Sequence, residues 1–411
     1  MRRAAVAALA AAATLLTVPN QAQARDCPDA VGAQAAIVIE ASTGTVVCQR
    51  QADKRLSIGS ATKLMTALVT LEKAKMSETF TASDYRPAPI ESQIRLLPGE
   101  RMKVSDLMRG LLLESGNDAA VTLAEGVSGS RKAFIREMNR RARELELENT
   151  HFANPIGLDQ EGNYSSARDL VLLAKVLREY TFFNKIVDSP SGTLKTGDHP
   201  RTFRNRNKLV ARYPWVNGVK TGHTRGAGYV LVGSGSRNGI QLISAVLGTP
   251  SEAARDNDTM ALLNWAIPKF QRVRAVVEGK TMATAQIRDR QGATLKLAPD
   301  RTVRRIIERG KRDEITTTVQ APDVVEGPIR SGQRLGRVEV RQAGTLVATV
   351  ALVAKSAVPA PTPAQKAKTW AARPWVIGGI GVVLIATVLL VSRRARTSRR
   401  RPSRREARAA S

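Results

Sequence analysis

The sequence predicts an α+β fold in which helices pack on an antiparallel sheet, followed by a small all-β domain and a transmembrane helix. Helical patterns lie between β-rich segments at both ends of residues 25–270, which favours a sheet covered by helices. Alternating strand patterns without helices fill residues 271–355. An uncharged apolar stretch follows near the C-terminus, and it predicts a helix that spans a membrane.

The elements of the first domain can be placed in chain order. Residues 35–48 contain two β-rich runs around a Ser-Thr-Gly turn, a pattern typical of a hairpin. Residues 218–248 contain two alternating strands that form a second hairpin. Apolar residues at helical spacing predict helices over 61–74, 105–126, 134–145, 167–180 and 253–270. The helical pattern of 105–126 is interrupted by Ser-Gly-Asn at its centre.

The second domain and the segment after it differ in composition. Strand patterns in residues 271–355 are separated by turn residues, such as Gln291-Gly292 and Ala343-Gly344. Residues 356–373 are rich in Pro and Ala, and they predict a semi-rigid, extended linker.

The N-terminus is typical of a secretory signal peptide. Two arginines precede a short apolar run, and Ala22-Gln23-Ala24 is a small-x-small cleavage site. The alternative is an N-terminal membrane anchor, for which an apolar run of about 15 residues is short. We therefore expect residues 1–24 to be removed from an exported protein.

The C-terminal apolar segment, residues 374–392, is long enough as a helix to cross a bilayer core. Trp370 and Trp375 lie at its start, where interfacial aromatic residues are common. Residues 393–411 form a tail with nine Arg and one Glu, and the positive-inside rule places this tail in the cytoplasm. The alternative is a buried core helix, which the adjacent arginines disfavour. We expect a single-pass cell-membrane protein in which the chain before this helix lies outside the cytoplasm.

The composition excludes several classes of protein. Of the net charge of +28, two units lie in residues 1–24 and eight in the tail, and the rest are spread along the chain. An exported domain is not in the compartment that holds the genome, so nucleic acid is a poor partner. Anionic lipid head groups and an anionic cell-wall polymer are better candidates, and a basic surface without a specific partner remains possible. Three His and two Cys are too few for a zinc finger or an iron–sulfur protein, and we expect neither metal nor cofactor. Outside the cytosol Cys27 and Cys48 can form a disulfide, although two unpaired cysteines remain possible.

Three short motifs bear groups that can carry chemistry. Ser60 and Lys63 lie one helical turn apart at the head of a predicted helix, so the amine can reach the hydroxyl. A lysine can act as a base toward serine only if burial or a nearby cation lowers its pKa. Ser115 and Asn117 lie on the break in the second helical pattern, where a hydroxyl could relay a proton.

The third motif is Lys220-Thr221-Gly222 at the beginning of a strand. Lys and Thr can bind a carboxylate, and Gly allows another chain to approach the backbone closely. Each motif alone is weak evidence. The three together, in this order and spacing, form a known signature set of serine enzymes.

With this set the sequence resembles the superfamily of penicillin-binding proteins and serine β-lactamases, and in particular the low-molecular-mass D-alanyl-D-alanine carboxypeptidases. The resemblance covers residues 35–270 almost continuously and implies a β-lactamase/transpeptidase-like fold. It is carried by the stretches SIGSATKLMTAL, LPGERMKVSDLMRGLLLESGNDAAVTLAE, NTHFANPIGLD, RNRNKL and GVKTGHTRGAGYVLVGS. The β domain and a C-terminal membrane attachment also match the domain order of that group.

The resemblance implies roles for the motif residues. Ser60 matches the nucleophile that forms an acyl-enzyme, and Lys63 matches its base. Ser115 matches a proton relay, while Asn117 matches the residue that orients the base and the substrate amide. Lys220 matches the cation that tunes the relay serine.

Further positions match groups that bind substrate. Thr221 and Thr224 would face the substrate carboxylate, and the backbone N–H of His223 would complete an oxyanion hole with that of the nucleophile. Arg206 and Arg255 match basic positions that bind the terminal carboxylate or support the site.

The implied function is that of a serine-type D-Ala-D-Ala carboxypeptidase that removes the terminal D-Ala from peptidoglycan stem pentapeptides, with β-lactams as inhibitors. Alternatives from the same chemistry are a β-lactamase and a D,D-endopeptidase. A β-lactamase needs a base for deacylation, and the sequence lacks the Glu-x-x-x-Asn pattern that one class of those enzymes uses. A non-catalytic cell-wall-binding protein is the remaining alternative, although all motif residues are present.

Overall fold

The computed structural model describes residues 25–288, 290, 292–371 and 374–398. The chain divides into two compact units, one before and one after the peptide bond between Arg272 and Val273. The predicted signal peptide, residues 1–24, and the end of the basic tail, residues 399–411, lie outside the described residues.

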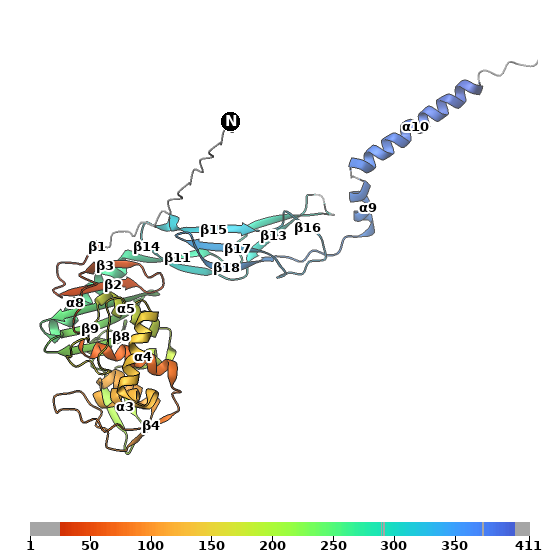
Figure 1. Ribbon diagram of the computed structural model, residues 1–411. Coiled ribbons are helices and arrows are strands. Elements are labelled where there is room, and N and C mark those ends of the chain that lie inside the picture. Colours follow the sequence, from red (N-terminus) through yellow and green to blue (C-terminus); the bar gives the residue numbers. More distant parts are fainter. Residues whose placement is uncertain (1–24, 289, 291, 372–373, 399–411) are drawn as a thin grey trace, which may run out of the picture. The chain divides into compact units, whose positions relative to one another are not determined.

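The first unit contains a six-stranded sheet with the strand order β1-β3-β2-β10-β9-β8. All neighbouring strands are antiparallel except β1 and β3. Both predicted hairpins lie in this sheet (Figure 1). Its strands are β1 (Arg25–Asp26), β2 (Ala35–Glu40), β3 (Val46–Arg50), β8 (Val216–Thr224), β9 (Gly228–Arg237) and β10 (Ile240–Thr249).

Helices cover both faces of the sheet, which explains why β2 is buried at every position. Ile37 and Ile39 belong to the large apolar core that also contains the buried side of α5 (Ala167–Leu177). On the opposite face, Thr259 of α8 (Glu252–Ala266) packs against Gly233 of β9. Burial on both faces accounts for strands that are apolar throughout rather than alternating.

The remaining helices build the part of the unit that carries the motifs. The predicted helix over 105–126 is three segments: α2 ends at Arg109, a turn of π-helix follows, and α3 begins at Asn117. The elements are η1 (Gly59–Thr62), α1 (Lys63–Lys73), α2 (Val104–Arg109), η2 (Gly110–Glu114), α3 (Asn117–Ser128), α4 (Arg131–Glu144), α6 (Thr181–Val187), α7 (Lys208–Arg212) and η3 (Ile267–Lys269). Two small hairpins join β4 (Thr79–Thr81) with β5 (Arg101–Lys103) and β6 (Ser191–Leu194) with β7 (Arg201–Arg204).

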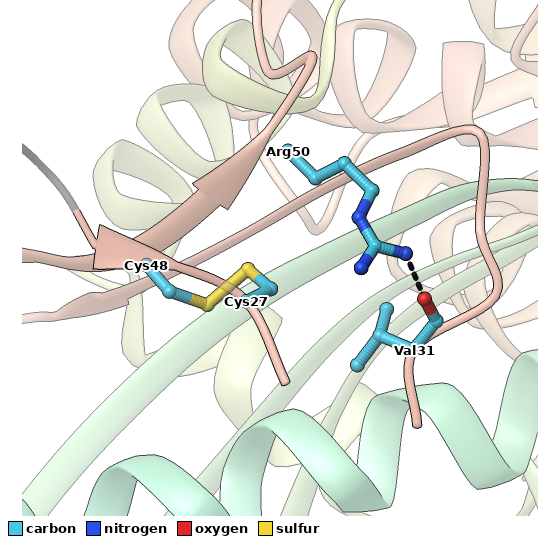
Figure 2. The surroundings of a disulfide bond; sticks show 4 residues. All are labelled: Cys27, Val31, Cys48 and Arg50. Atoms are coloured by element: carbon cyan, nitrogen blue, oxygen red, sulfur yellow. Dashed lines mark hydrogen bonds between the residues drawn. A yellow bond between two sulfur atoms is a disulfide. The ribbon is translucent and has the colours of Figure 1, made fainter. Parts of the chain in front are cut away.

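A disulfide joins Cys27 to Cys48 of β3, which decides between the two possibilities that the sequence left open. Figure 2 shows the bond beside a hydrogen bond that Arg50 donates to the carbonyl of Val31. The disulfide closes a loop between residues 21 positions apart, and it fixes the start of the described chain to the edge of the sheet.

The second unit contains a six-stranded sheet with the strand order β15-β17-β18-β13-β12-β16. Its neighbouring strands are antiparallel except for β12 and β16. Val338 and Val340 of β17 are buried and alternate with partly or fully exposed charged residues, as a sheet with one covered face requires. The strands are β12 (Ala283–Ile287), β13 (Thr294–Pro299), β15 (Ile315–Gln320), β16 (Val324–Val325), β17 (Arg334–Gln342) and β18 (Thr345–Ala354). Two further strands, β11 (Phe270–Val276) and β14 (Val303–Glu308), form a separate two-stranded sheet.

The C-terminal segments differ from their predictions. Helix α9 (Pro363–Ala371) replaces part of the predicted extended linker, because Pro is favourable in the first turn and Ala, Gln and Lys are good helix formers. Helix α10 (Pro374–Ser398) covers the predicted membrane span. Within the described part of the chain, however, no helix combines the length and apolar character that crossing a membrane requires, so the predicted transmembrane helix is not found. The side chains at 374, 376–378 and 380 of that predicted span lie outside the described residues.

Candidate active site

The first motif lies where a short 3-10 helix runs into α1. Ser60 belongs to η1, and Lys63 is the first residue of α1. The Nζ atom of Lys63 lies 2.9 Å from the Oγ atom of Ser60, so the predicted contact across one helical turn is formed. Lys63 is fully buried.

The surroundings of Lys63 suit a neutral amine. Besides Ser60, its Nζ atom has two partners, the Oδ1 atom of Asn117 and the carbonyl of Ile156, each at 2.6 Å. A neutral amine has two N–H donors and one lone pair, so donation to these two oxygens leaves the lone pair for the Ser60 hydroxyl. Burial, reinforced by the positive charge of Lys220, holds the pKa of Lys63 well below its usual value.

Ser115 is held in an unusual backbone conformation between the π-helical turn and α3. Its φ of 67° lies in the left-handed region, which costs a non-glycine residue about 1 kcal/mol and is common at functional sites. The buried Nζ atom of Lys220 lies 3.0 Å from the Oγ atom of Ser115. The three motifs, far apart in the sequence, therefore meet at one site.

Lys220 enters the site from β8 and also donates to the carbonyl of Thr221. Burial, together with the positive charges of Arg206 and Arg255, lowers the pKa of Lys220 to about 7. The two lysines thus offer one amine that is readily neutral and one that is charged over part of the physiological pH range.

Glycines allow β8 to lie directly against the serine motif. A Cβ atom on Gly222 would lie 2.4 Å from the carbonyl oxygen of Ile58 and 3.3 Å from the backbone nitrogen of Ser60. On the other side, a Cβ atom on Gly59 would lie 2.8 Å from the backbone nitrogen of His223. The backbone N–H groups of Ser60 and His223 belong to these two closely packed segments, as an oxyanion hole requires.

The other predicted binding residues are spread around this centre. Thr221 is buried next to Lys220. The hydroxyl of Thr224 donates a hydrogen bond to Asp159 at 2.7 Å. The ring of His223 stacks on that of Tyr229. The two predicted arginines are paired with carboxylates: Arg206 with Glu114, and Arg255 with Asp256 and Glu252. Both arginines act on Lys220 through their charge.

The sequence did not single out Glu91 and Tyr85, which also reach the site. The Nδ2 atom of Asn117 donates to the Oε2 atom of Glu91 at 2.6 Å, and the hydroxyl of Tyr85 donates to the same oxygen. The segment around Glu91 lacks helical or strand periodicity, so only the tertiary contacts reveal it. No cluster of three or more metal-ligating side chains occurs among the residues that the structure describes.

Comparison with known proteins identifies the class to which this fold and site belong. The family model described as D-alanyl-D-alanine carboxypeptidase matches residues 20–251, and the model described as penicillin-binding protein 5, C-terminal domain, matches residues 270–360. The chain therefore belongs to the D-alanyl-D-alanine carboxypeptidase family, among the low-molecular-mass penicillin-binding proteins.

Individual relatives match most of the chain. D-alanyl-D-alanine carboxypeptidase DacF of Bacillus subtilis is 32% identical over 330 residues, which are 79% of this chain and 85% of DacF. DacC of Escherichia coli is 33% identical over 337 residues, 76% of this chain and 81% of DacC. The crystal structure of penicillin-binding protein 5 from Haemophilus influenzae is similar with a TM-score of 0.59 and 29% identity, over 81% of this chain and 99% of that chain. The predicted family, the α+β fold with a β domain and the serine-type carboxypeptidase activity are thereby confirmed.

Proposed function

We propose that this enzyme removes the C-terminal D-Ala from peptidoglycan stem pentapeptides through an acyl-enzyme at Ser60. One observation carries the assignment of the nucleophile and the base. The amine of Lys63 lies 2.9 Å from the Ser60 hydroxyl, and acceptors occupy its two other hydrogen-bonding directions. A lysine in these surroundings can take a proton from serine at neutral pH.

In the proposed acylation, Ser60 Oγ attacks the carbonyl carbon of the terminal peptide bond while Lys63 takes the hydroxyl proton. The backbone N–H groups of Ser60 and His223 stabilise the negative charge that develops on the carbonyl oxygen. The proton passes through Ser115 to the nitrogen of the departing D-Ala as the C–N bond breaks. Water then hydrolyses the ester and restores the Ser60 hydroxyl.

The leaving D-Ala carries the free carboxylate of the substrate. We assign its binding to Lys220 and Thr221, whose side chains come from β8, with the charges of Arg206 and Arg255 in support. Lys220 is buried and within hydrogen-bonding distance of Ser115, so it links carboxylate binding to the proposed proton relay. Thr224 and the Lys220-Thr221-Gly222 strand would align the substrate backbone.

The domain and location assignments are also proposals. Residues 1–24 would direct export, 25–270 would form the catalytic domain, 271–355 the β domain, and 356–373 the connection to a membrane-associated segment at 374–392 with a basic tail. The sequence features of both ends support an extracytoplasmic enzyme at the cell membrane. Cell fractionation of the full chain and of a chain ending at residue 373 tests this, because only the full chain should sediment with membranes.

Incubation of the purified full chain with a peptide ending in D-Ala-D-Ala tests the activity. We expect release of D-Ala and, with penicillin, a mass increase on Ser60, both abolished by Ser60→Ala. An enzyme that releases no D-Ala and forms no adduct would contradict the proposal. Crosslinked muropeptides and a chromogenic cephalosporin, added in parallel, distinguish the endopeptidase and β-lactamase alternatives.

A further inference from the structure

Beside the motif residues, one carboxylate is built into the site and has no role in the mechanism described above. Glu91 lies on the segment between β4 and β5, and its Oε2 atom accepts hydrogen bonds from the Asn117 amide and the Tyr85 hydroxyl. Its other oxygen, Oε1, accepts from the backbone N–H of Ala88 at 3.0 Å. The carboxylate is therefore held by three donors.

The segment that carries Glu91 is fixed to the Ser-Gly-Asn motif. The backbone N–H of Asn117 donates to the carbonyl of Ser92 at 2.7 Å. The buried carboxylate of Asp118 accepts from the backbone N–H groups of Ile94 and Leu96 at 2.9–3.0 Å. The segment that carries Glu91 is thus held by the backbone of Asn117 and by the side chain of the adjacent Asp118.

The contact with Glu91 decides which way the Asn117 amide faces. The oxygen and nitrogen of an amide are nearly equal in size, so its orientation follows from its partners. A carboxylate only accepts hydrogen bonds, so the Nδ2 atom must face Glu91 and the Oδ1 atom must face Lys63. In the flipped orientation the amide would donate to the lone pair of Lys63, and the amine could no longer take the Ser60 proton.

Glu91 is ionised in these surroundings. Burial favours the neutral acid, but the hydrogen bonds from Tyr85, Asn117 and the Ala88 N–H outweigh it and lower the pKa of Glu91. Burial, the hydrogen bond to Glu91 and the Glu91 charge raise the pKa of Tyr85, which keeps its hydroxyl a donor.

We propose that Glu91 is a positioning residue for acylation, which holds the Asn117 amide so that its oxygen faces the Lys63 amine and Ser60 keeps access to the amine's lone pair. This inference rests on the proposed function, because it assumes that Lys63 activates Ser60. Glu91 acts through Asn117, and the donors to its carboxylate are Asn117, Tyr85 and the backbone N–H of Ala88.

The substitution Glu91→Gln tests the proposal with almost no change in volume. A glutamine can present an N–H to Asn117 and so permits the flipped amide. We expect the second-order rate constant for acylation of the full chain by penicillin to fall about 10- to 100-fold. Glu91→Asp should recover part of the rate, because it retains an acceptor-only carboxylate. Asp84→Asn, which removes an exposed carboxylate from the same segment, serves as the matched control and should acylate at the parent rate.

Two readouts separate positioning from a merely structural effect. In an Asn117→Ala background, Glu91→Gln should cause no further loss of rate, because the group through which Glu91 acts is absent. The acid limb of the acylation rate should also move to lower pH in Glu91→Gln, since the charge that favours protonated Lys63 is removed. The other charged groups around Lys63, namely Lys220, Asp118 and Arg206, remain unchanged.

The outcomes distinguish the two proposals. If the parent chain is acylated but Glu91→Gln reacts at the parent rate, or loses the same factor with and without Asn117, the role of Glu91 is refuted and the proposed function stands. If the parent chain itself is not acylated by penicillin at Ser60, both proposals fail. A thermal melt of Glu91→Gln close to that of the parent, together with the loss of rate, supports the positioning role.

Discussion

Replacement of Gly222 by Ala tests whether β8 must lie directly against the serine motif. The added Cβ atom would lie 2.4 Å from the carbonyl oxygen of Ile58 and 3.1 Å from the backbone nitrogen of Ala61. Relaxed carbon–oxygen contacts are about 3.3 Å or longer, so the two backbones must separate by about 1 Å. Because a misplacement of that size can cost about 100-fold in rate, we expect acylation by penicillin to slow by about that factor.

Stopped-flow or quenched mass spectrometry measures the acylation rate constant of this variant. Gly32→Ala is the control, because the nearest atom to its Cβ would be the Oδ2 atom of Asp258 at 4.0 Å. Overpacking should lower the free energy of unfolding of Gly222→Ala by about 1–3 kcal/mol, which thermal unfolding reports separately. A folded Gly222→Ala variant that is acylated at the parent rate would refute the close approach of β8 to Ser60.

Three further predictions concern Lys220 and the disulfide. The pKa of Lys220 is lowered to about 7, so the amine is charged below this pH and neutral above it. We therefore expect kcat/KM for a D-Ala-D-Ala peptide to decline as the pH rises through about 7. A flat profile up to pH 9 would argue against carboxylate binding by Lys220. The unfolded chain keeps Lys220 protonated to about pH 10.4, so the lowered pKa of Lys220 destabilises the fold at pH 7 by up to about 4 kcal/mol. Lys220→Met should abolish activity yet raise the free energy of unfolding by about 2 kcal/mol, because the loss of the hydrogen bonds to Ser115 and Thr221 offsets part of the gain. Denaturant titration measures this, and a less stable variant would contradict it. Replacement of both Cys27 and Cys48 by Ala should lower the free energy of unfolding by about 3 kcal/mol, and an unchanged melting curve would show that the bond does not stabilise the first unit.

The sequence was most informative where local pattern and chemistry coincide. Ser60 and Lys63 can touch because helical spacing places them on one face, and the structure brings them to 2.9 Å. Both hairpins of the main sheet and the long helices α1, α5 and α8 lie where apolar periodicity predicts them. These features depend on residues close in sequence, so one chain suffices to predict them.

Features that depend on tertiary contacts were not predictable. The sequence indicates the break at Ser-Gly-Asn, but the apolar pattern reveals neither the π-helical turn before it nor the left-handed backbone of Ser115. The carbonyl of Ile156 contacts Lys63, and Glu91 contacts Asn117. Both lie on segments without helical or strand periodicity. Conversely, Pro and Ala in residues 356–373 suggested an extended linker, whereas Pro at a helix start is compatible with α9.

The proposed acylation requires that Lys63 is a neutral amine that can take the proton of Ser60. Nuclear magnetic resonance of lysine labelled at the side chain measures this most directly, with Lys63→Arg to assign the signal. We expect the Lys63 signal to titrate well below the usual lysine range, because of burial and the nearby Lys220. A Lys63 signal that titrates with the exposed lysines near pH 10.4 would contradict it.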